Sequence, residues 1–145
     1  MGERMSSQFS MLLRERKLLK AHITRGMIVK EIRAAQSDLQ DAHDSLDARK
    51  FKWATIQGYY SMFHSARALL YHRRLREKSH YALLVAIREL YAEELGKDLI
   101  SAFEDGMELR QEADYGLKFS EDGALDTVGN AEGFLKKSKE ILKVK

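Results

Sequence analysis

The chain has 145 residues, a formal net charge of +3, and apolar and charged fractions of 44% and 32%, which are the proportions of a globular domain and not of a disordered chain. It contains no proline and no cysteine, so long helices are favoured, and disulfide bonds, thiolate zinc sites and thiol nucleophiles are excluded. We find no apolar run near the roughly 18 residues that span a bilayer and no pattern of a secretion signal, and we therefore expect a soluble, cytoplasmic protein that has no membrane span.

The first half of the chain divides into an N-terminal segment and two long helices. Residues 1–22 mix apolar and basic side chains and are predicted to form an arm or an extra helix. Residues 24–47 place apolar side chains at steps of three and four, which gives a helix with one apolar face. Residues 51–74 carry two adjacent apolar rows, as is typical of the central helix of a bundle. Gly58 within this helix costs about 1 kcal/mol relative to alanine, and we interpret it as a point where a neighbouring helix approaches closely.

The second half predicts three further helices. Ser79 is a candidate N-cap for a helix that ends near Gly96. Another helix is expected over residues 98–115, and a last one begins between residues 120 and 127 and continues to about residue 142. Strand-type alternation is not found, and the short connections make successive helices antiparallel neighbours. The sequence therefore predicts an all-α, up-and-down bundle of four to five antiparallel helices in residues 23–145.

The most concentrated polar segment spans residues 64–80 and is basic. It holds a single acidic residue among the cationic and histidine side chains His64, Arg67, His72, Arg73, Arg74, Arg76, Lys78 and His80. One interpretation is a solvated helix end, since cations near a helix C-terminus complement the helix dipole. The other interpretation is an anion site for phosphate or an RNA backbone, because arginine offers a bidentate pair of donors.

Within this segment, Arg74 and His80 are a candidate catalytic pair for RNA cleavage without a metal. If the chain turns between them, the histidine can move a proton of the 2′-hydroxyl or leaving group, and the arginine can stabilise charge on the phosphorane. The histidines recur every eight residues without the paired spacing of a helical zinc motif. We therefore expect no metal site and no cofactor.

A second polar cluster lies at the end of the helix predicted for residues 98–115. Arg110 and Asp114 are four residues apart, and Glu112 and Tyr115 are beside them. If the pair is exposed, it is an ordinary helical salt bridge worth a few tenths of a kcal/mol. If the helix faces Tyr59 and Tyr60 inside the bundle, the pair belongs to a buried polar network, which is more often functional.

Three motifs in the sequence resemble those of HEPN domains, and in particular the small single-domain prokaryotic HEPN proteins. Residues 57–70, with the sequence QGYYSMFHSARALL, resemble the central helix of that family. The tripeptide Lys78-Ser79-His80 follows at the expected distance, and residues 110–116, RQEADYG, resemble a later helix. The resemblance covers about residues 25–142.

This resemblance implies a bundle that forms a homodimer and acts with a minimal nucleotidyltransferase, often as a toxin–antitoxin pair, in a nucleotide- or RNA-related role. The ribonuclease branch of the family carries an arginine followed after four to six residues by a histidine, late in the chain. Here Arg110 has no such histidine, and Tyr115 stands in that segment. Arg74 and His80 match this spacing, but they lie in the middle of the chain. By the same resemblance, Tyr115 is a candidate for modification by the partner transferase.

Our leading hypothesis is a non-catalytic or weakly catalytic HEPN protein that binds a nucleotide or RNA. In it, Arg110 contacts phosphate, Asp114 orients the arginine, and tyrosines stack on a base. The full set of candidate binding residues is Tyr59, Tyr60, His64, Lys78, His80, Arg110, Asp114 and Tyr115. Two alternatives remain, a metal-independent endoribonuclease that uses Arg74 and His80, and a helical module whose exposed apolar face serves only to form a dimer.

Overall fold

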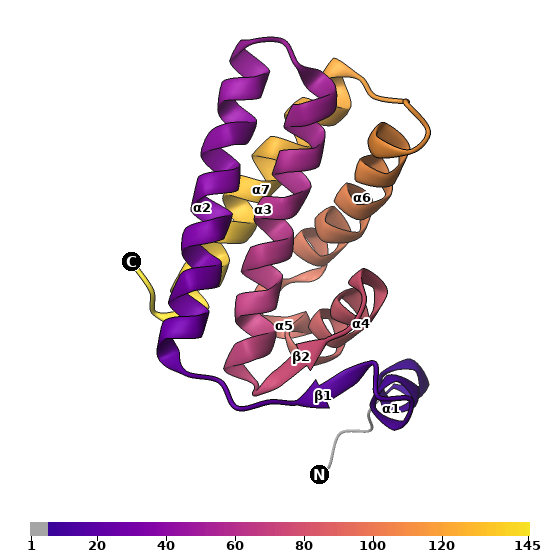
Figure 1. The fold of residues 1–145 in the computed structure, drawn as a ribbon, viewed down its shortest axis with the longest axis vertical. Coiled ribbons are helices and arrows are strands. Elements are labelled where there is room, and N and C mark those ends of the chain that lie inside the picture. The colour runs from indigo at the N-terminus through magenta and orange to yellow at the C-terminus, as the bar shows by residue number, and fades with distance from the viewer. Residues whose placement is uncertain (1–5) are drawn as a thin grey trace.

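The computed structural model describes residues 6–145, and its centre is the helix α3 (Phe51–His72) (Figure 1). Fourteen of the 22 residues of α3 are buried, because three long helices pack around it: α2 (Arg25–Asp47), α6 (Lys97–Asp114) and α7 (Glu121–Leu142). The predicted all-α antiparallel bundle is confirmed. The bounds of these helices lie within a few residues of the predicted ones.

The predicted helix after Ser79 is confirmed at its start and divided near its end. The hydroxyl of Ser79 accepts a hydrogen bond from the backbone N–H of Ala82 at 3.0 Å and begins α4 (His80–Leu90). Tyr91 then leaves the helical conformation, and its hydroxyl donates to the carbonyl oxygen of Leu69 at 2.7 Å. A short helix α5 (Ala92–Leu95) follows, and Gly96 adopts a positive φ of 87° before α6 begins. The buried contact of Tyr91 with α3 thus separates two helices that the sequence pattern joins.

The N-terminal segment contains a helix and a strand. After α1 (Ser7–Arg14) comes β1 (Leu18–Lys20), which pairs antiparallel with β2 (Leu75–Glu77). Phe9, Leu12 and Leu18 join the main hydrophobic core, so residues 7–20 pack against the bundle. The small sheet was not expected, because three residues per strand are too few for an alternating pattern and the partner strand is remote in sequence. Residues 1–5 of the predicted arm lie outside the described residues.

Gly58 marks a place where α3 and α7 approach closely. A side-chain Cβ at this position would lie 3.1 Å from the Thr127 methyl carbon and 3.4 Å from the Thr127 carbonyl carbon and from a methyl carbon of Val128. The interpretation of Gly58 as a point of close helix approach is therefore confirmed.

None of the helices in residues 6–145 has the length and apolar character that crossing a membrane requires.

Candidate functional site

Arg110 of α6 is the most unusual charged residue of the bundle. Only 6% of its surface is exposed. The central carbon of its guanidinium lies 5.4 Å from the ring centre of Tyr59, 5.6 Å from that of Tyr60 and 6.0 Å from that of Tyr115. These distances are typical of cation–π contacts. Three tyrosines from α3 and the end of α6 thus surround one buried cation.

The hydrogen bonding of Arg110 is incomplete. Its only acidic partner among residues 6–145 is Asp114, with 3.7 Å between the nearest nitrogen and oxygen, which is longer than a good hydrogen bond. The Nε atom is buried and has no partner within the described chain. Because buried donors are nearly always paired in folded proteins, this guanidinium has donor capacity left for an anion or for water.

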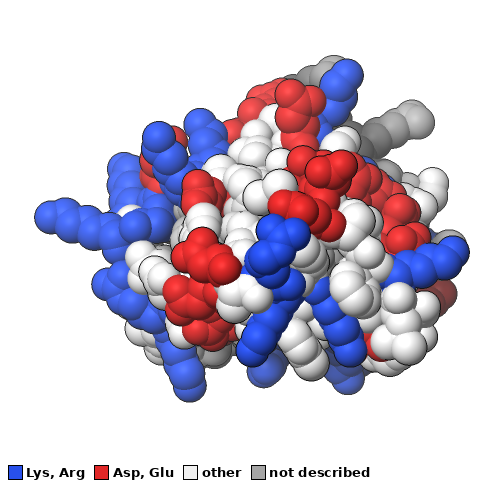
Figure 2. Space-filling view, turned by 90° about the horizontal axis from the view of Figure 1, so that it is seen from above, with Lys and Arg blue, Asp and Glu red and all other residues white. Residues whose placement is uncertain are grey.

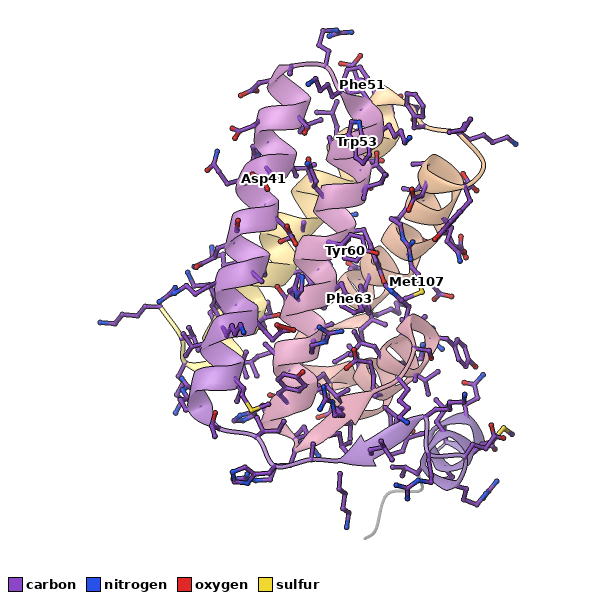
Figure 3. The ribbon with its side chains drawn as sticks, in the orientation of Figure 1. Asp41, Phe51, Trp53, Tyr60, Phe63 and Met107 are labelled. Carbon is purple, nitrogen blue, oxygen red and sulfur yellow. The ribbon has the colours of Figure 1, made fainter. Side chains whose placement is uncertain are left out.

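Tyr59 and His80 form a second, connected part of the site. The hydroxyl of Tyr59 is hydrogen-bonded to Nδ1 of His80, the first residue of α4. The ring of Phe63 lies 4.6 Å from the His80 ring, centre to centre, and the ring of Phe103 stacks on Tyr59 at 5.9 Å. Figure 3 shows Tyr60 and Phe63 on α3 beside Met107 of α6. Helices α3, α4 and α6 therefore position one continuous aromatic cluster around Tyr59.

Burial favours a neutral Tyr59, and burial and charge together favour a neutral His80 imidazole. Burial raises the pKa of Tyr59 well above its ordinary value, although nearby Arg110 acts in the opposite direction. Burial also lowers the pKa of His80, and the positive charge of Arg110 lowers it further. A neutral imidazole has a ring nitrogen that can accept a proton, so the cluster combines a fixed cation with a proton acceptor.

The structure thus brings together six of the predicted site residues, namely Tyr59, Tyr60, His80, Arg110, Asp114 and Tyr115. Asp114 and Tyr115 lie at its exposed edge, with 76% of the Tyr115 surface accessible. The sequence left open whether Arg110 and Asp114 form an exposed salt bridge or part of a buried network. The structure lies between these alternatives, since the arginine is buried and the aspartate is partly exposed.

His64 belongs to a different cluster, between α2 and α3. Its ring nitrogens lie 3.4 Å from a carboxylate oxygen of Glu31 and 3.5 Å from one of Asp38. Arg67 donates to Glu31 at 3.1 Å and to Glu77 at 2.8 and 2.9 Å. Burial alone would raise the pKa of Glu31, but the hydrogen bonds and charges of His64 and Arg67 lower it overall. The His64 ring on α3 therefore contacts carboxylates of α2 and lies outside the aromatic cluster.

Lys78 and Arg74 lie at the two ends of β2, outside the aromatic cluster. Lys78 is exposed, and its backbone N–H donates to the carbonyl oxygen of Lys17 at 2.9 Å. The guanidinium of Arg74 reaches the carbonyl oxygen of Ile23 at 3.4 Å, whereas the His80 ring contacts Tyr59 and Phe63. Arg74 and His80 have no contact partner in common among the described residues. The arginine whose charge acts most strongly on His80 is Arg110.

Two residues of the aromatic cluster were missed by the sequence analysis, Phe63 and Phe103. Each fits the apolar row of its helix, so nothing in the sequence separates them from ordinary core residues. The one available signal was helical spacing, because Phe63 follows Tyr59 by four residues and therefore lies on the same face of α3.

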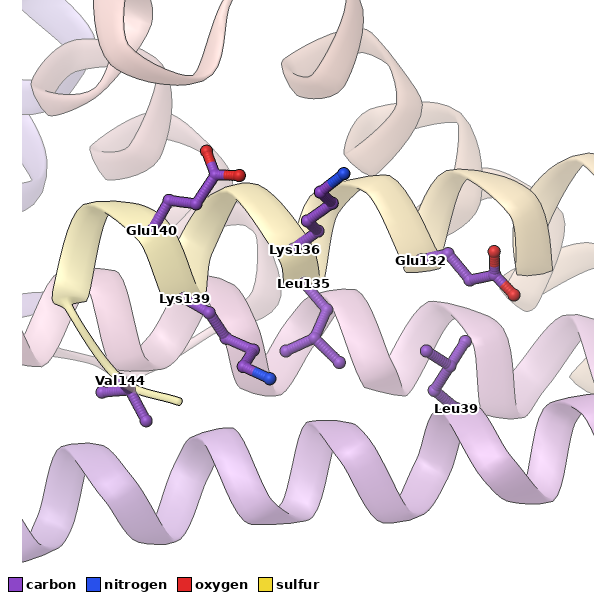
Figure 4. A pocket seen from close by; sticks show the side chains of 7 residues that line it. All are labelled: Leu39, Glu132, Leu135, Lys136, Lys139, Glu140 and Val144. Carbon is purple, nitrogen blue, oxygen red and sulfur yellow. The ribbon is translucent and has the colours of Figure 1, made fainter.

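One further groove holds no predicted site residue. A groove of about 520 Å³ lies between α2 and α7, with Leu39 and Leu135 at its base and Lys136 and Lys139 among the residues along it (Figure 4). Within residues 6–145, no group of three or more histidine, aspartate or glutamate side chains is placed to hold a metal ion.

Comparison with known proteins relates the chain to one family. A family model for the HEPN domain matches residues 29–145. A protein of Archaeoglobus fulgidus named "UPF0332 protein" is 34% identical over 115 residues, which cover 77% of this chain and 91% of the relative. A protein of Methanocaldococcus jannaschii named "Putative toxin" is 31% identical over 118 residues, which cover 77% of this chain and 86% of the relative. The resemblance seen in the sequence motifs is confirmed, and the chain belongs to the HEPN domain family.

Proposed function

We propose that this HEPN protein binds a nucleotide or RNA through Arg110 and the surrounding tyrosines, and that it acts with a nucleotidyltransferase in a module of the toxin–antitoxin kind. The observation that carries the binding proposal is the buried guanidinium with an unpartnered Nε, enclosed by three tyrosine rings. The name of the Methanocaldococcus jannaschii relative supports the toxin part of the proposal.

The chemistry of the site suits a phosphate next to a base. A guanidinium forms paired, charge-assisted hydrogen bonds with phosphate oxygens, and Arg110 has donors that the protein does not use. Tyr115 is exposed at the mouth of the site, where its ring is accessible for stacking on a base. Asp114 is partly exposed, and its carboxylate lies 3.7 Å from the Arg110 guanidinium. We expect ligand phosphate to replace water at Arg110 and the base to contact Tyr115.

The test is calorimetric titration of the purified protein with AMP, ATP and a short single-stranded RNA at low salt. Arg110→Lys keeps the charge but loses the planar pair of donors, and it should weaken binding about tenfold or more, as expected for a charge-assisted pair. Arg88→Lys is the matched control, because Arg88 forms an exposed ion pair with Glu104. Wild-type protein that binds none of the three ligands would refute the binding proposal.

The partnership with a nucleotidyltransferase needs a separate experiment. A transferase encoded beside this gene should co-purify with the chain when the two are expressed together. Incubation of the pair with labelled ATP then shows whether nucleotide is transferred to the chain, and Tyr115→Phe should abolish labelling if Tyr115 is the acceptor.

A metal-independent endoribonuclease remains the second candidate. The position of His80 favours Arg110, in place of Arg74, as its catalytic partner. His80 lies in the field of Arg110, which also contacts its hydrogen-bond partner Tyr59. In this candidate, His80 moves the proton and Arg110 stabilises the phosphorane charge, the role first considered for Arg74. Cleavage of a labelled RNA in excess EDTA should be lost in His80→Ala and Arg110→Ala and kept in Arg74→Ala. Loss in Arg74→Ala with retention in Arg110→Ala would restore the original pair.

A further inference from the structure

A strongly basic surface lies at the end of the molecule where β1 and β2 pair (Figure 1). We call residues 14–25 and 73–78 the basic ribbon. They hold nine of the 25 lysines and arginines of the chain and two of its 22 acidic residues, so the rest of the chain has four more acids than bases. At the opposite end of the molecule, acidic and basic side chains are interspersed (Figure 2). The modest net charge of the protein therefore hides a marked separation of charge.

Most cations of the basic ribbon are exposed and have no acidic partner. Six of them make no ion pair and no side-chain hydrogen bond with residues 6–145: Arg14, Arg16, Lys17, Lys20, Arg76 and Lys78. Of the two acids, Glu77 is engaged by Arg67. The positive charge of the ribbon is thus available to a ligand.

The backbone pairing holds these like charges close together. The Lys78 N–H donates to the Lys17 carbonyl at 2.9 Å, and the Ala21 N–H donates to the Arg74 carbonyl at 3.0 Å, so cations lie at both ends of the strand pair. From Arg74 to Lys78 an extended strand covers roughly 13 Å. Like charges placed side by side on paired strands are destabilising, and a ligand with several negative charges would relieve this repulsion.

We propose that the basic ribbon binds the phosphate backbone of single-stranded nucleic acid, without regard to sequence, at a place separate from Arg110. A row of exposed cations over this length matches a polymer of regularly spaced phosphates. A folded acidic protein would also need a desolvated apolar centre in the interface, and no large apolar side chain of the ribbon itself is exposed. The family match begins at residue 29, so the β1 half of the ribbon lies outside the part that the family shares.

The test compares two variants that lose the same charge. Lys20→Gln, Arg76→Gln and Lys78→Gln together alter the ribbon. Lys50→Gln, Lys97→Gln and Lys136→Gln alter exposed lysines elsewhere that form no ion pair with the described residues. Binding of labelled U20 and dT20 oligonucleotides is measured by fluorescence anisotropy from low to high salt. We expect about tenfold weaker binding in the ribbon variant. We also expect the slope of log affinity against log salt concentration to be shallower by about two, since each of three lost single-strand phosphate contacts contributes about 0.7 to that slope.

The outcomes separate this proposal from the one for Arg110. Arg110→Lys should weaken AMP binding and leave the salt dependence of U20 binding unchanged. The ribbon variant should keep AMP binding and show a weaker salt dependence of U20 binding. Equal U20 affinity in the ribbon and control variants would overturn the proposal. So would competition by polyglutamate as effective as that by U20 at equal charge, because that result assigns the ribbon to acidic proteins. Similar affinities for U20 and dT20 are expected from backbone binding, and a preference above about tenfold would contradict it.

Discussion

Arg110 shows how a single side chain can be stabilised by a site and still be incompletely satisfied there. Cation–π contacts with tyrosine offset part of the cost of burying the guanidinium, yet they use the faces of the rings and leave the N–H donors free. A lysine would not act in the same way, because its compact ammonium lacks the flat shape that packs between rings. Arg110 therefore keeps an unused hydrogen-bond donor inside the bundle.

His80 makes the stability of the protein depend on pH. Its pKa is lowered in the folded state by burial and by Arg110, from an ordinary value of 6.5. Below that pH the unfolded chain takes up a proton that the folded chain resists, so the free energy of unfolding falls on acidification and is unaffected well above it. We expect urea unfolding between pH 5 and 8 to show this loss as the pH falls below about 6.5. His80→Gln should show a flatter profile from pH 6.5 downward, and an identical slope in the variant would contradict the argument.

The residues of the site were predictable from the sequence only in part. Arg110 and Tyr115 were found as part of a polar cluster at a helix end, whose motif also resembles the family, and Tyr59 because it lies next to Tyr60 in an apolar helix. The separation of His64 from the aromatic cluster has a physical reason. It lies on the same helix as the two tyrosines, but its ring is bound by Glu31 and Asp38 of α2. Local spacing does not reveal which neighbouring helix supplies a partner.

At the scale of elements, the crossing of α3 and α7 depends on Gly58. A methyl group at Gly58 would press against Thr127 and Val128, whereas one at Gly129 on α7 would meet no atom within 4 Å. Gly58→Ala should therefore lower the free energy of unfolding by about 1–3 kcal/mol through overpacking. Gly129→Ala should raise it by about 0.5–1 kcal/mol, because alanine is the better helix former. Chemical denaturation measures both changes, and stabilisation by Gly58→Ala would show that the crossing can relax.

The helices themselves were more predictable than the helix break and the strand pairing that depend on remote contacts. Serine caps and apolar periodicity define α4 and α7, since both signals are local. The break at Tyr91 and the pairing of β1 with β2 depend on contacts with remote residues, Leu69 in the first case and residues 75–77 in the second. Such contacts override local propensity and leave no short-range pattern.

At the scale of the whole molecule, exposed apolar side chains gather around the connection between α6 and α7. Trp53 lies near the start of α3 (Figure 3), and Leu117 and Phe119 belong to the connection itself, with 49%, 68% and 52% of their surfaces exposed. Phe119 lines a hollow together with Thr55 of α3, so the two segments adjoin. We propose that the chain forms a homodimer and that this surface, the apolar patch, is its interface.

Sedimentation velocity over a range of protein concentrations tests the homodimer. Leu117→Asp with Phe119→Asp should give a monomer, because it places charge in a buried interface. Met11→Asp should leave the dimer intact, since Met11 is an exposed apolar residue of α1. A wild-type protein that is monomeric at every concentration would refute the proposal, and dissociation by Met11→Asp alone would move the interface to α1.

The pairing of β1 with β2 also has a consequence for biosynthesis. On the ribosome, Leu18–Lys20 is made first but has no partner until residues 75–77 follow. During that interval α2 and α3 are already complete, and the two helices form a hairpin from local contacts that close quickly. The N-terminal segment therefore cannot complete its strand pairing until residues 75–77 are made, and during that delay its cations are accessible to any nearby polyanion, including the RNA of the ribosome itself.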